Sequence, residues 1–269
     1  MADHTTYGLV CSELSEDLSK TNLGEFKLDS FQDNSVQIKI KAASLNFPDL
    51  LMTQGKYQNR PNLPFALGME GAGIVEQVGS GVSSFKEGDE VMFGGWGHGA
   101  IAESIILPEG LVSLKPKSLN FSEAASFKTA YLTAYVGLIR RGELKQGETL
   151  LVHGASGGVG MAAVQMGKLY DARVIASGTS DEKLKIVKTW GADEIINTGL
   201  EGSVSFREEV KDLTEGKGAD VIYDPVGGDV FDESIRCINW GGRLLIIGFT
   251  SGRIPTVPVN YPLIKGFSV

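Results

Sequence analysis

The stretch that decides the fold is Thr149–Gly160, which reads TLLVHGASGGVG and leads an apolar, strand-like run directly into a glycine-rich turn. Aligned with the dinucleotide-binding pattern G-x-G-x-x-G, it becomes Ala155-x-Gly157-x-x-Gly160, a variant whose first glycine is replaced. Gly157 would let the backbone approach a pyrophosphate, and Gly160 would let the next helix pack against the strand. Free N–H groups at the helix start would hold the phosphates. The stretch therefore predicts a nucleotide-binding turn; the alternative is a tight strand–helix turn without a ligand.

After this turn, segments of strand length and helix length alternate along the chain. Such alternation is typical of βαβ units and predicts a parallel, doubly wound sheet. Right-handed crossovers then bring the carboxyl ends of the strands to one edge. The expected strands are 149–153, 173–177, 194–197, 220–223 and 243–247, and the expected helices are 159–170, 181–190, 206–214 and 230–238.

The first part of the chain has a different character. Short strand-like runs such as Val36–Ala42, Gly73–Val78 and Glu90–Phe93 are separated by glycine, proline and asparagine. This pattern predicts a largely antiparallel or barrel-like β domain. We expect two domains, 1–122 and 123–269, with an α/β fold overall.

Composition excludes several classes of protein. The chain has 25 Lys+Arg and 33 Asp+Glu, a formal net charge of −8, which speaks against a partner that is a nucleic acid or an anionic membrane. Two cysteines rule out a disulfide framework and a four-cysteine metal site. No apolar run approaches the roughly 18 residues of a membrane span, and no targeting segment is evident. We expect a cytoplasmic protein.

The end of the second predicted strand indicates which nucleotide binds. NAD-binding proteins usually place an acidic residue there to hold the ribose 2′-hydroxyl. Here the first acid, Asp181, falls where the next helix should begin. Ser177, Thr179 and Lys183 instead offer hydroxyls and a positive charge to a 2′-phosphate, so NADPH is the predicted cofactor. The alternative for Lys183 is a solvated lysine on a helix.

The whole chain resembles the medium-chain dehydrogenase/reductase superfamily, specifically its zinc-free quinone oxidoreductase, or zeta-crystallin-like, branch. That resemblance implies an N-terminal GroES-like β-barrel domain for substrate and catalysis, followed by a Rossmann domain for NADP(H). The matching segments are 43–49 (ASLNFPD), 55–57 (GKY), 63–73 (LPFALGMEGAG), 85–91 (FKEGDEV), 133–135 (TAY), 155–160 (ASGGVG), 224–228 (DPVGG) and 241–243 (GGR).

The resemblance also implies roles for individual residues. Asn46 and Thr133 should lie near the nicotinamide and its ribose, and Asp49 and Tyr57 should line the substrate cleft. Asn46 and Tyr57 are the predicted catalytic residues, with Tyr57 orienting a carbonyl or donating a proton, although solvent could also supply that proton. The alternatives are a packed aromatic for Tyr57 and a pair of hydrogen-bonding loop residues for Asn46 and Asp49.

No metal is expected. Zinc-dependent relatives carry a cysteine near the position of Asn46 and a histidine near that of Met69, and neither residue here is a good zinc ligand. A reaction without metal suits a quinone or an α,β-unsaturated carbonyl, whose conjugation spreads the charge after hydride transfer. The predicted cofactor contacts are Asn46, Thr133, Ala155, Ser156, Gly157, Gly158, Val159, Gly160, Ser177, Thr179, Lys183, Thr198, Gly248 and Phe249.

The last residues of the chain depart from the family pattern. The segments 257–261 and 263–269 look like the approach to a sixth sheet strand, and family members continue beyond it. We therefore expect a truncated chain, with an incomplete first domain and without the seam of the family's homodimer. Two alternatives to an NADPH-dependent quinone or enone reductase follow: a non-catalytic NADPH-binding protein and an enoyl-thioester reductase.

Overall fold

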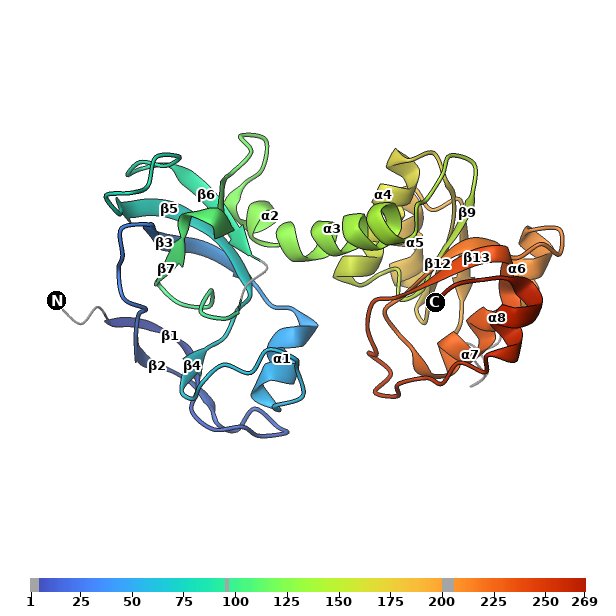
Figure 1. Ribbon diagram of the computed structural model, residues 1–269, viewed down its shortest axis with the longest axis horizontal. Helices are drawn as coiled ribbons and strands as arrows, with labels where there is room; N and C mark the ends of the chain where they lie inside the picture. Colours follow the sequence, from blue (N-terminus) through green and yellow to red (C-terminus); the bar gives the residue numbers. More distant parts are fainter. Residues whose placement is uncertain (1–4, 95–96, 200–205) are drawn as a thin grey trace. The chain divides into compact units, whose positions relative to one another are not determined.

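The computed structural model describes residues 5–94, 97–199 and 206–269. The chain divides into two compact units, of which the first ends at Thr129 and the second begins at Ala130. This division falls within helix α3 (Lys128–Tyr135), later in the chain than the predicted boundary at residue 122. Figure 1 shows the strands of the first unit in blue to green and the strands and helices of the second in light green to red.

The first unit is built from antiparallel strands, as the GroES-like expectation requires. One sheet has the order β2-β1-β4, and the other has the order β7-β3-β5-β6-β8. Val36, Ile38, Val75, Val91 and Phe93 form much of its buried core. The strands are β1 (Thr5–Cys11), β2 (Thr21–Lys27), β3 (Ser35–Ser44), β4 (Phe65–Ala66), β5 (Glu70–Val78), β6 (Glu90–Gly94), β7 (Ser104–Pro108) and β8 (Val112–Leu114), and the helical segments are η1 (Glu109–Leu111) and α2 (Phe121–Ala125).

A short helix that we did not predict, α1 (Phe47–Thr53), follows strand β3. Its start carries familiar signals, because Asn46 is the N-cap, Pro48 lies in the first turn and Asp49 is the acidic residue of a capping box. The backbone N–H of Asn46 donates to Asp49 Oδ2 at 2.7 Å. Seven residues are too few to show a clear helical period, so the periodicity of the sequence does not predict this helix.

The second unit is a parallel sheet with strand order β11-β10-β9-β12-β13, which confirms the predicted doubly wound fold. Strands β9 and β12 are neighbours at the point where the order reverses, and ligands of such sheets bind at that point. The elements are η2 (Val136–Arg141), β9 (Thr149–Val152), α4 (Gly158–Leu169), β10 (Arg173–Gly178), α5 (Asp181–Thr189), β11 (Glu194–Asn197), α6 (Arg207–Leu213), β12 (Ala219–Asp224), α7 (Gly228–Cys237) and β13 (Ile238–Ile246).

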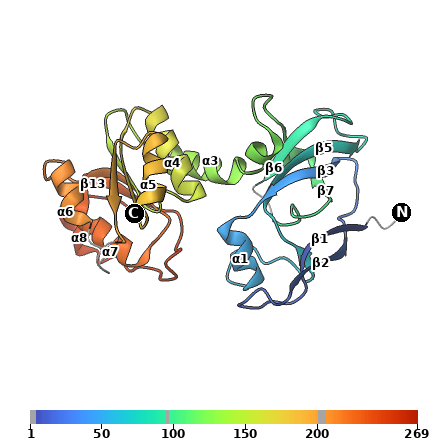
Figure 2. The same ribbon diagram turned by 180° about the vertical axis from the view of Figure 1, so that it is seen from behind.

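Helices cover both faces of this sheet. On one face, α4 and α5 pack on a cluster that includes Leu150, Val164 and Val187. On the other face, α6 and α7 pack on a cluster that includes Phe206 and Phe231. Figure 2 shows α4 and α5 side by side in yellow, apart from α6 and α7 in orange. Burial on both faces explains why the strands of this half are continuous apolar runs and do not alternate with polar residues.

The end of the chain approaches the sheet beside β13, as expected, and does so through a short helix. Residues Asn260–Lys265 form a helix, α8, which ends at Gly266 in the left-handed conformation. Only beyond this helix does the chain align with the sheet, where Ser268 forms a parallel bridge with Arg243 and its carbonyl accepts from Leu244 N at 2.9 Å. The helix itself was not predicted, because six residues are too few to show a helical period.

Both Cys11 and Cys237 are buried free thiols. Burial raises the pKa of Cys237 to about 12. Within the described residues, no helix has the combined length and apolar character needed to cross a bilayer.

A buried histidine joins three elements beneath the nucleotide-binding turn. His153 follows β9 and is 1% exposed; its Nδ1 lies 2.7 Å from Ser177 Oγ of β10, and its Nε2 lies 2.9 Å from Ser234 Oγ of α7. Ser234 already donates its hydroxyl hydrogen to Val230 O at 2.7 Å, so it accepts from His153 Nε2–H. Nδ1 must therefore accept from Ser177. Both nitrogens are satisfied only in the neutral imidazole, and burial lowers the pKa of His153 to about 3.

The pKa of His153 predicts an acid-sensitive fold. The folded protein resists protonation at pH values where the unfolded chain, with an ordinary histidine pKa near 6.5, already binds a proton. Stability contributed by His153 is thus complete above about pH 6.5 and falls as the pH drops from there toward 3, by about 1.4 kcal/mol per pH unit. Urea unfolding of the wild type between pH 7 and pH 5, compared with His153→Asn, should show that the variant loses this part of the slope. Equal slopes would contradict the assignment.

Candidate functional site

The turn between β9 and α4 exposes residues Ser156–Gly158 at the start of the helix, and we call these three residues the crest. Ser156, Gly157 and Gly158 are exposed, whereas Ala155 and Gly160 are buried beneath them. Gly154 has a φ of +55°, and the N-cap Gly157 is extended. No side chain caps α4, so the N–H groups of its first turn, which have no intrahelical acceptors, are left for a ligand. This geometry fits a dinucleotide pyrophosphate.

Gly160 permits the close packing on which this crest depends. A Cβ atom at residue 160 would lie 2.4 Å from Gly154 O and 2.8 Å from Ala155 Cα, both backbone atoms that cannot move independently. At Gly158, by contrast, a Cβ atom would meet nothing within 4 Å. The two glycines therefore serve different purposes. Gly160 allows helix α4 to approach the turn, and Gly158 leaves the space above the turn open.

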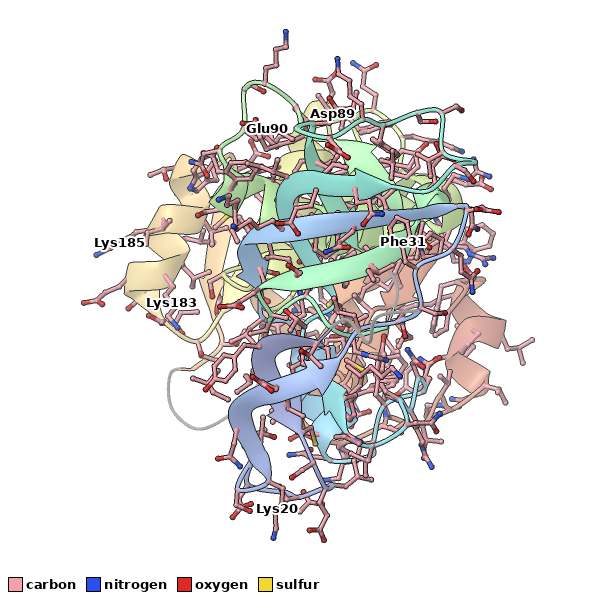
Figure 3. All side chains as sticks on the ribbon, turned by 90° about the vertical axis from the view of Figure 1, so that its left-hand side faces the viewer. Lys20, Phe31, Asp89, Glu90, Lys183 and Lys185 are labelled. Carbon is pink, nitrogen blue, oxygen red and sulfur yellow. The ribbon has the colours of Figure 1, made fainter. Side chains whose placement is uncertain are left out.

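The far end of the predicted cofactor site lies around the carboxyl end of β10. Thr198 donates from its N and Oγ1 to Gly178 O at 2.8 and 3.2 Å, which joins the loops after β10 and β11. Thr179 is exposed, and so is Lys183 in the first turn of α5. Figure 3 shows Lys183 and Lys185 projecting from this helix. Asp181 begins α5 as expected and accepts from Asn197 Nδ2 at 2.6 Å.

The structure does not bring Ser177 together with Thr179 and Lys183. Ser177 is 2% exposed, and its hydroxyl is engaged with His153 beneath the sheet edge. Its position near the strand end suggested a phosphate contact, but Ser177 still lies within β10, where helices cover both faces of the sheet and enclose its side chain. Its hydroxyl is accordingly unavailable to a phosphate.

The loops after β12 and β13 pack closely beside the turn. Asp224, at the end of β12, is buried, and its Oδ1 accepts from Val226 N and Gly227 N at 2.8 and 2.9 Å. Burial raises the pKa of Asp224. Gly248 donates to Asp224 O at 3.4 Å, and a Cβ at Gly227 would meet Phe249 at 2.9 Å. The predicted contacts Gly248 and Phe249 therefore belong to a tightly packed loop at the carboxyl edge of the sheet.

The first unit carries a second polar group, centred on a buried carboxylate that sequence reasoning missed. Glu70 opens β5 directly opposite Ser44 of β3 and is 1% exposed. Its Oε1 accepts from Ser44 Oγ at 2.6 Å and from Asn46 Nδ2 at 3.0 Å, and its Oε2 accepts from Thr129 N at 2.8 Å. Asn46 Nδ2 also lies 3.0 Å from Ser44 Oγ. A signal was present, because an acid beside Met69 in an otherwise apolar segment needs partners when buried.

Asp49 has a structural place in the described unit. It is 1% exposed, and its two oxygens accept from Asn46 N and Gly68 N. Burial raises the pKa of Asp49, and the two backbone donors act in the opposite direction. The alternative of a hydrogen-bonding loop pair thus describes Asp49 better than a residue lining the substrate cleft.

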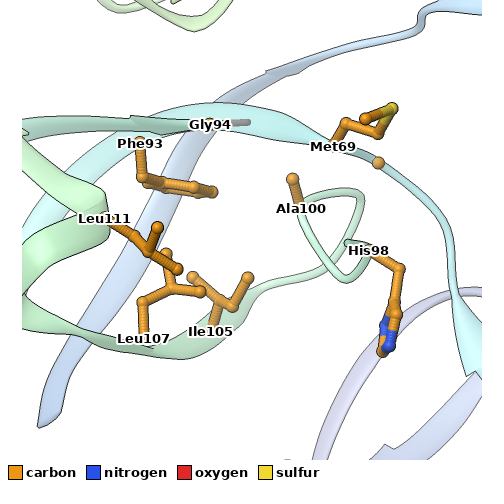
Figure 4. Close-up of a pocket in the computed structure, with 9 residues that line it drawn as sticks. Met69, Phe93, Gly94, His98, Ala100, Ile105, Leu107 and Leu111 are labelled. Atoms are coloured by element: carbon orange, nitrogen blue, oxygen red, sulfur yellow. The ribbon is translucent and has the colours of Figure 1, made fainter. Parts of the chain in front are cut away.

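Tyr57 and Met69 share an apolar environment. Both pack, half-buried, against the cluster of Cys11, Met52, Phe65 and Leu67. Met69 also lines a small pocket, where Figure 4 shows Phe93, Ile105, Leu107 and Leu111 gathered at one side and Met69 and His98 apart from them. Burial lowers the pKa of His98.

These surroundings do not fit a catalytic zinc ion. Asn46 directs its amide nitrogen to Glu70 and Ser44, and Met69 offers a thioether among apolar side chains, whereas zinc in proteins takes thiolate, imidazole or carboxylate donors. In the part of the chain that the structure describes, no three His, Cys, Asp or Glu side chains are grouped to hold a metal ion.

A GroES-like unit followed by a Rossmann unit with a glycine-rich turn defines a nucleotide-dependent dehydrogenase of the medium-chain type. Residues 32–117 match the alcohol dehydrogenase GroES-like domain, and residues 158–269 match the zinc-binding dehydrogenase family. The chain is 38% identical over 261 residues to the quinone oxidoreductase-like protein 2 homolog of Nematostella vectensis, with 97% of this chain and 70% of that protein covered.

Solved structures agree with this assignment. The quinone oxidoreductase of Pseudomonas syringae pv. Tomato DC3000 superposes with a TM-score of 0.90 at 32% identity, over 98% of this chain and 80% of that one. The Escherichia coli quinone oxidoreductase complexed with NADPH gives a TM-score of 0.88 at 31% identity, over 99% and 80%. The chain belongs to the quinone oxidoreductase-like branch of the medium-chain dehydrogenase/reductase superfamily and is an oxidoreductase, which confirms the resemblance.

The two glycines of the turn predict opposite effects on stability. Gly160→Ala forces a Cβ against the Gly154 carbonyl, so we expect a loss of about 1–3 kcal/mol in the free energy of unfolding. Gly158→Ala meets open space and replaces glycine in the first turn of a helix, so stability should stay equal or rise by up to about 1 kcal/mol. Urea denaturation of both variants at pH 7 measures this. A Gly160→Ala protein as stable as Gly158→Ala would contradict the close packing.

Proposed function

We propose that this protein is an NADPH-dependent reductase of quinones or α,β-unsaturated carbonyls that works without zinc. The observation that carries the proposal is the open crest Ser156–Gly158 above the uncapped start of α4, together with uncharged residues where NAD-binding proteins place an acid. Similarity to quinone oxidoreductases, including one complexed with NADPH, supports both the cofactor and the substrate class.

Each part of the cofactor would have its own residues. The crest and the first turn of α4 would hold the pyrophosphate through backbone N–H groups. Lys183 and Thr179 would contact the 2′-phosphate, with Thr198 supporting the loop beside them. The loop with Gly248 and Phe249, together with Thr133 of α3 and Asn46, would meet the nicotinamide end.

Reduction of a quinone or enone takes a hydride, which bound NADPH supplies, and a proton at the substrate oxygen or carbon. Tyr57 is the residue of this chain best suited to orient or protonate the substrate, because its ring is anchored in the apolar cluster while its hydroxyl receives no hydrogen bond from the described residues. The apolar surroundings of Tyr57 and Met69 suit a flat, conjugated substrate. The loss of the family's dimer seam and the cytoplasmic location remain predictions.

Cofactor preference tests the binding part of the proposal. We expect NADPH to raise the melting temperature more than NADH at equal concentration, since a tighter ligand stabilises the folded state more. Removing the charged contact in Lys183→Ala should weaken NADPH binding about tenfold and leave NADH binding unchanged. Lys185→Ala, on the same exposed helix, is the matched control. Stabilisation by NADH alone would overturn the assignment of the 2′-phosphate site.

Catalysis tests the role of Tyr57. If its hydroxyl donates a proton, Tyr57→Phe should lower kcat for NADPH oxidation with an enone by about a hundredfold. Tyr7→Phe, an exposed tyrosine of β1, serves as the control. An unchanged kcat would assign the proton to solvent, and turnover restricted to enoyl thioesters would favour the enoyl-thioester reductase. A protein that binds NADPH and never oxidises it with quinones, enones or thioesters would be the non-catalytic alternative.

A further inference from the structure

The side chain of Asn197, the last residue of β11, is held at both ends of its amide. Its Nδ2 donates to Asp181 Oδ1 at 2.6 Å, and its Oδ1 accepts from Gly199 N at 2.9 Å. The backbone N–H of Gly199 identifies which end of the amide is the oxygen, so the nitrogen must face the carboxylate. Hydrogen bonds to an ionised carboxylate are shorter and stronger than neutral ones. Asn197 thus fixes the direction of the Asp181 side chain.

The loop that carries Asn197 is itself anchored to the end of β10. Thr198 donates from its N and Oγ1 to Gly178 O at 2.8 and 3.2 Å. Gly199 packs so closely that a Cβ atom there would lie 2.8 Å from Thr179 O. Asn197 is also paired with Gly178 in the register of β10 and β11. The amide that holds Asp181 therefore has little freedom to move with it.

Asp181 and Lys183 project from opposite flanks of α5. They are two positions apart in its first turn, which separates their side chains by about 200° around the helix axis. The buried residues Leu184 and Val187 face the sheet between them. Asp181 lies on the flank toward β11, because it contacts Asn197 there. Lys183 consequently lies on the flank toward α4, which packs beside α5 on the same face of the sheet (Figure 2).

Strand order decides which flank a cofactor meets. The crest follows β9, and β10 lies between β9 and β11 in the sheet. Because a dinucleotide extends from the pyrophosphate-binding turn toward the end of the second strand, its ribose would approach α5 from the side of Lys183. Asp181 is the kind of residue with which NAD-binding proteins hold the ribose 2′-hydroxyl, and it lies only three positions beyond the end of β10. Its direction therefore decides whether it can bind that hydroxyl.

We propose that Asn197 is a positioning residue for cofactor specificity, which keeps the Asp181 carboxylate on the β11 flank of α5. The flank that meets the ribose then presents the positive charge of Lys183 to a 2′-phosphate. Released from Asn197, the Asp181 carboxylate would repel that phosphate and could accept a hydrogen bond from a 2′-hydroxyl. This inference deepens the proposed function and rests on it for the identity of the cofactor.

The first experiment measures binding without catalysis. Isothermal titration of the full chain with adenosine 2′,5′-bisphosphate and with AMP, which differ only at the 2′ position, gives the preference for the phosphate as a ratio of two Kd values. The wild type should prefer the bisphosphate, and Asn197→Ala should lower this preference about tenfold. Asn239→Ala is the matched control, because Asn239 Nδ2 also donates to a carboxylate, Asp220 Oδ1, at 2.6 Å, at the amino-terminal edge of the same sheet. It should leave the preference unchanged.

A second substitution separates positioning from a merely structural effect. In the Asn197→Ala protein, Asp181→Asn removes the released charge and should restore the preference to within about threefold of the wild type. In the wild-type background, Asp181→Asn should change the preference less than about twofold, because the carboxylate is already held on the other flank. If Asn197→Ala does not fold, Asn197→Asp keeps an acceptor for Gly199 N, cannot donate to Asp181 and should lower the preference at least as far.

The outcomes distinguish the two proposals. A preference that stays unchanged in the folded Asn197 variants, or a loss that Asp181→Asn does not restore, would overturn the inference and leave the proposed function intact. A wild-type protein that binds AMP at least as tightly as the bisphosphate would overturn the predicted preference for NADPH, and the inference with it.

Discussion

A buried carboxylate surrounded by donors is the interaction on which the candidate site of the first unit depends. Glu70 lies at the start of β5, where the strand register sets it opposite Ser44, and the loop after β3 brings Asn46 to the same oxygen. Its other oxygen receives the N–H of Thr129 in helix α3. A buried carboxylate loses its contacts with water, so burial costs free energy unless the protein supplies hydrogen-bond donors in their place. Its hydrogen bonds connect the loop after β3, the start of helix α3 and the side-chain amide of Asn46.

Burial separates the polar residues of this protein into two groups. Glu70, Asp49, Ser177 and His153 are enclosed, and their hydrogen-bonding atoms are satisfied by neighbours. Ser156, Thr179 and Lys183 are exposed, and we propose that their polar atoms bind the cofactor. His153 links β9, β10 and α7 beneath the turn, and Glu70 links β3, the start of α1 and the start of α3. Site residues of the two kinds look alike in a sequence, since serine or aspartate can serve either purpose.

Much of the second unit could be predicted because its signals are local. Continuous apolar runs, regular helix lengths and the glycines of Thr149–Gly160 each correspond to an element of the parallel sheet. Short helices were harder to predict from the sequence. Helix α1 has capping signals but only seven residues, and α8 has six residues within the predicted approach to a sixth strand. In both places the chain is too short for its periodicity to distinguish one structure from the other. Ser177 illustrates a different difficulty, because the burial of its hydroxyl against His153 depends on how β9, β10 and α7 pack together.

The sequence by itself determined the class of fold, the position of the nucleotide-binding turn and the poor match of Asn46 and Met69 to zinc, because each depends on residue type and spacing along the chain. Only the tertiary structure decided which polar side chains are free. The register of β3 and β5 brings Ser44, Asn46 and Glu70 together, and the packing of β9, β10 and α7 encloses His153 with Ser177 and Ser234. Hydrogen bonds between residues 24 to 81 positions apart depend on strand order and burial, which no local pattern records.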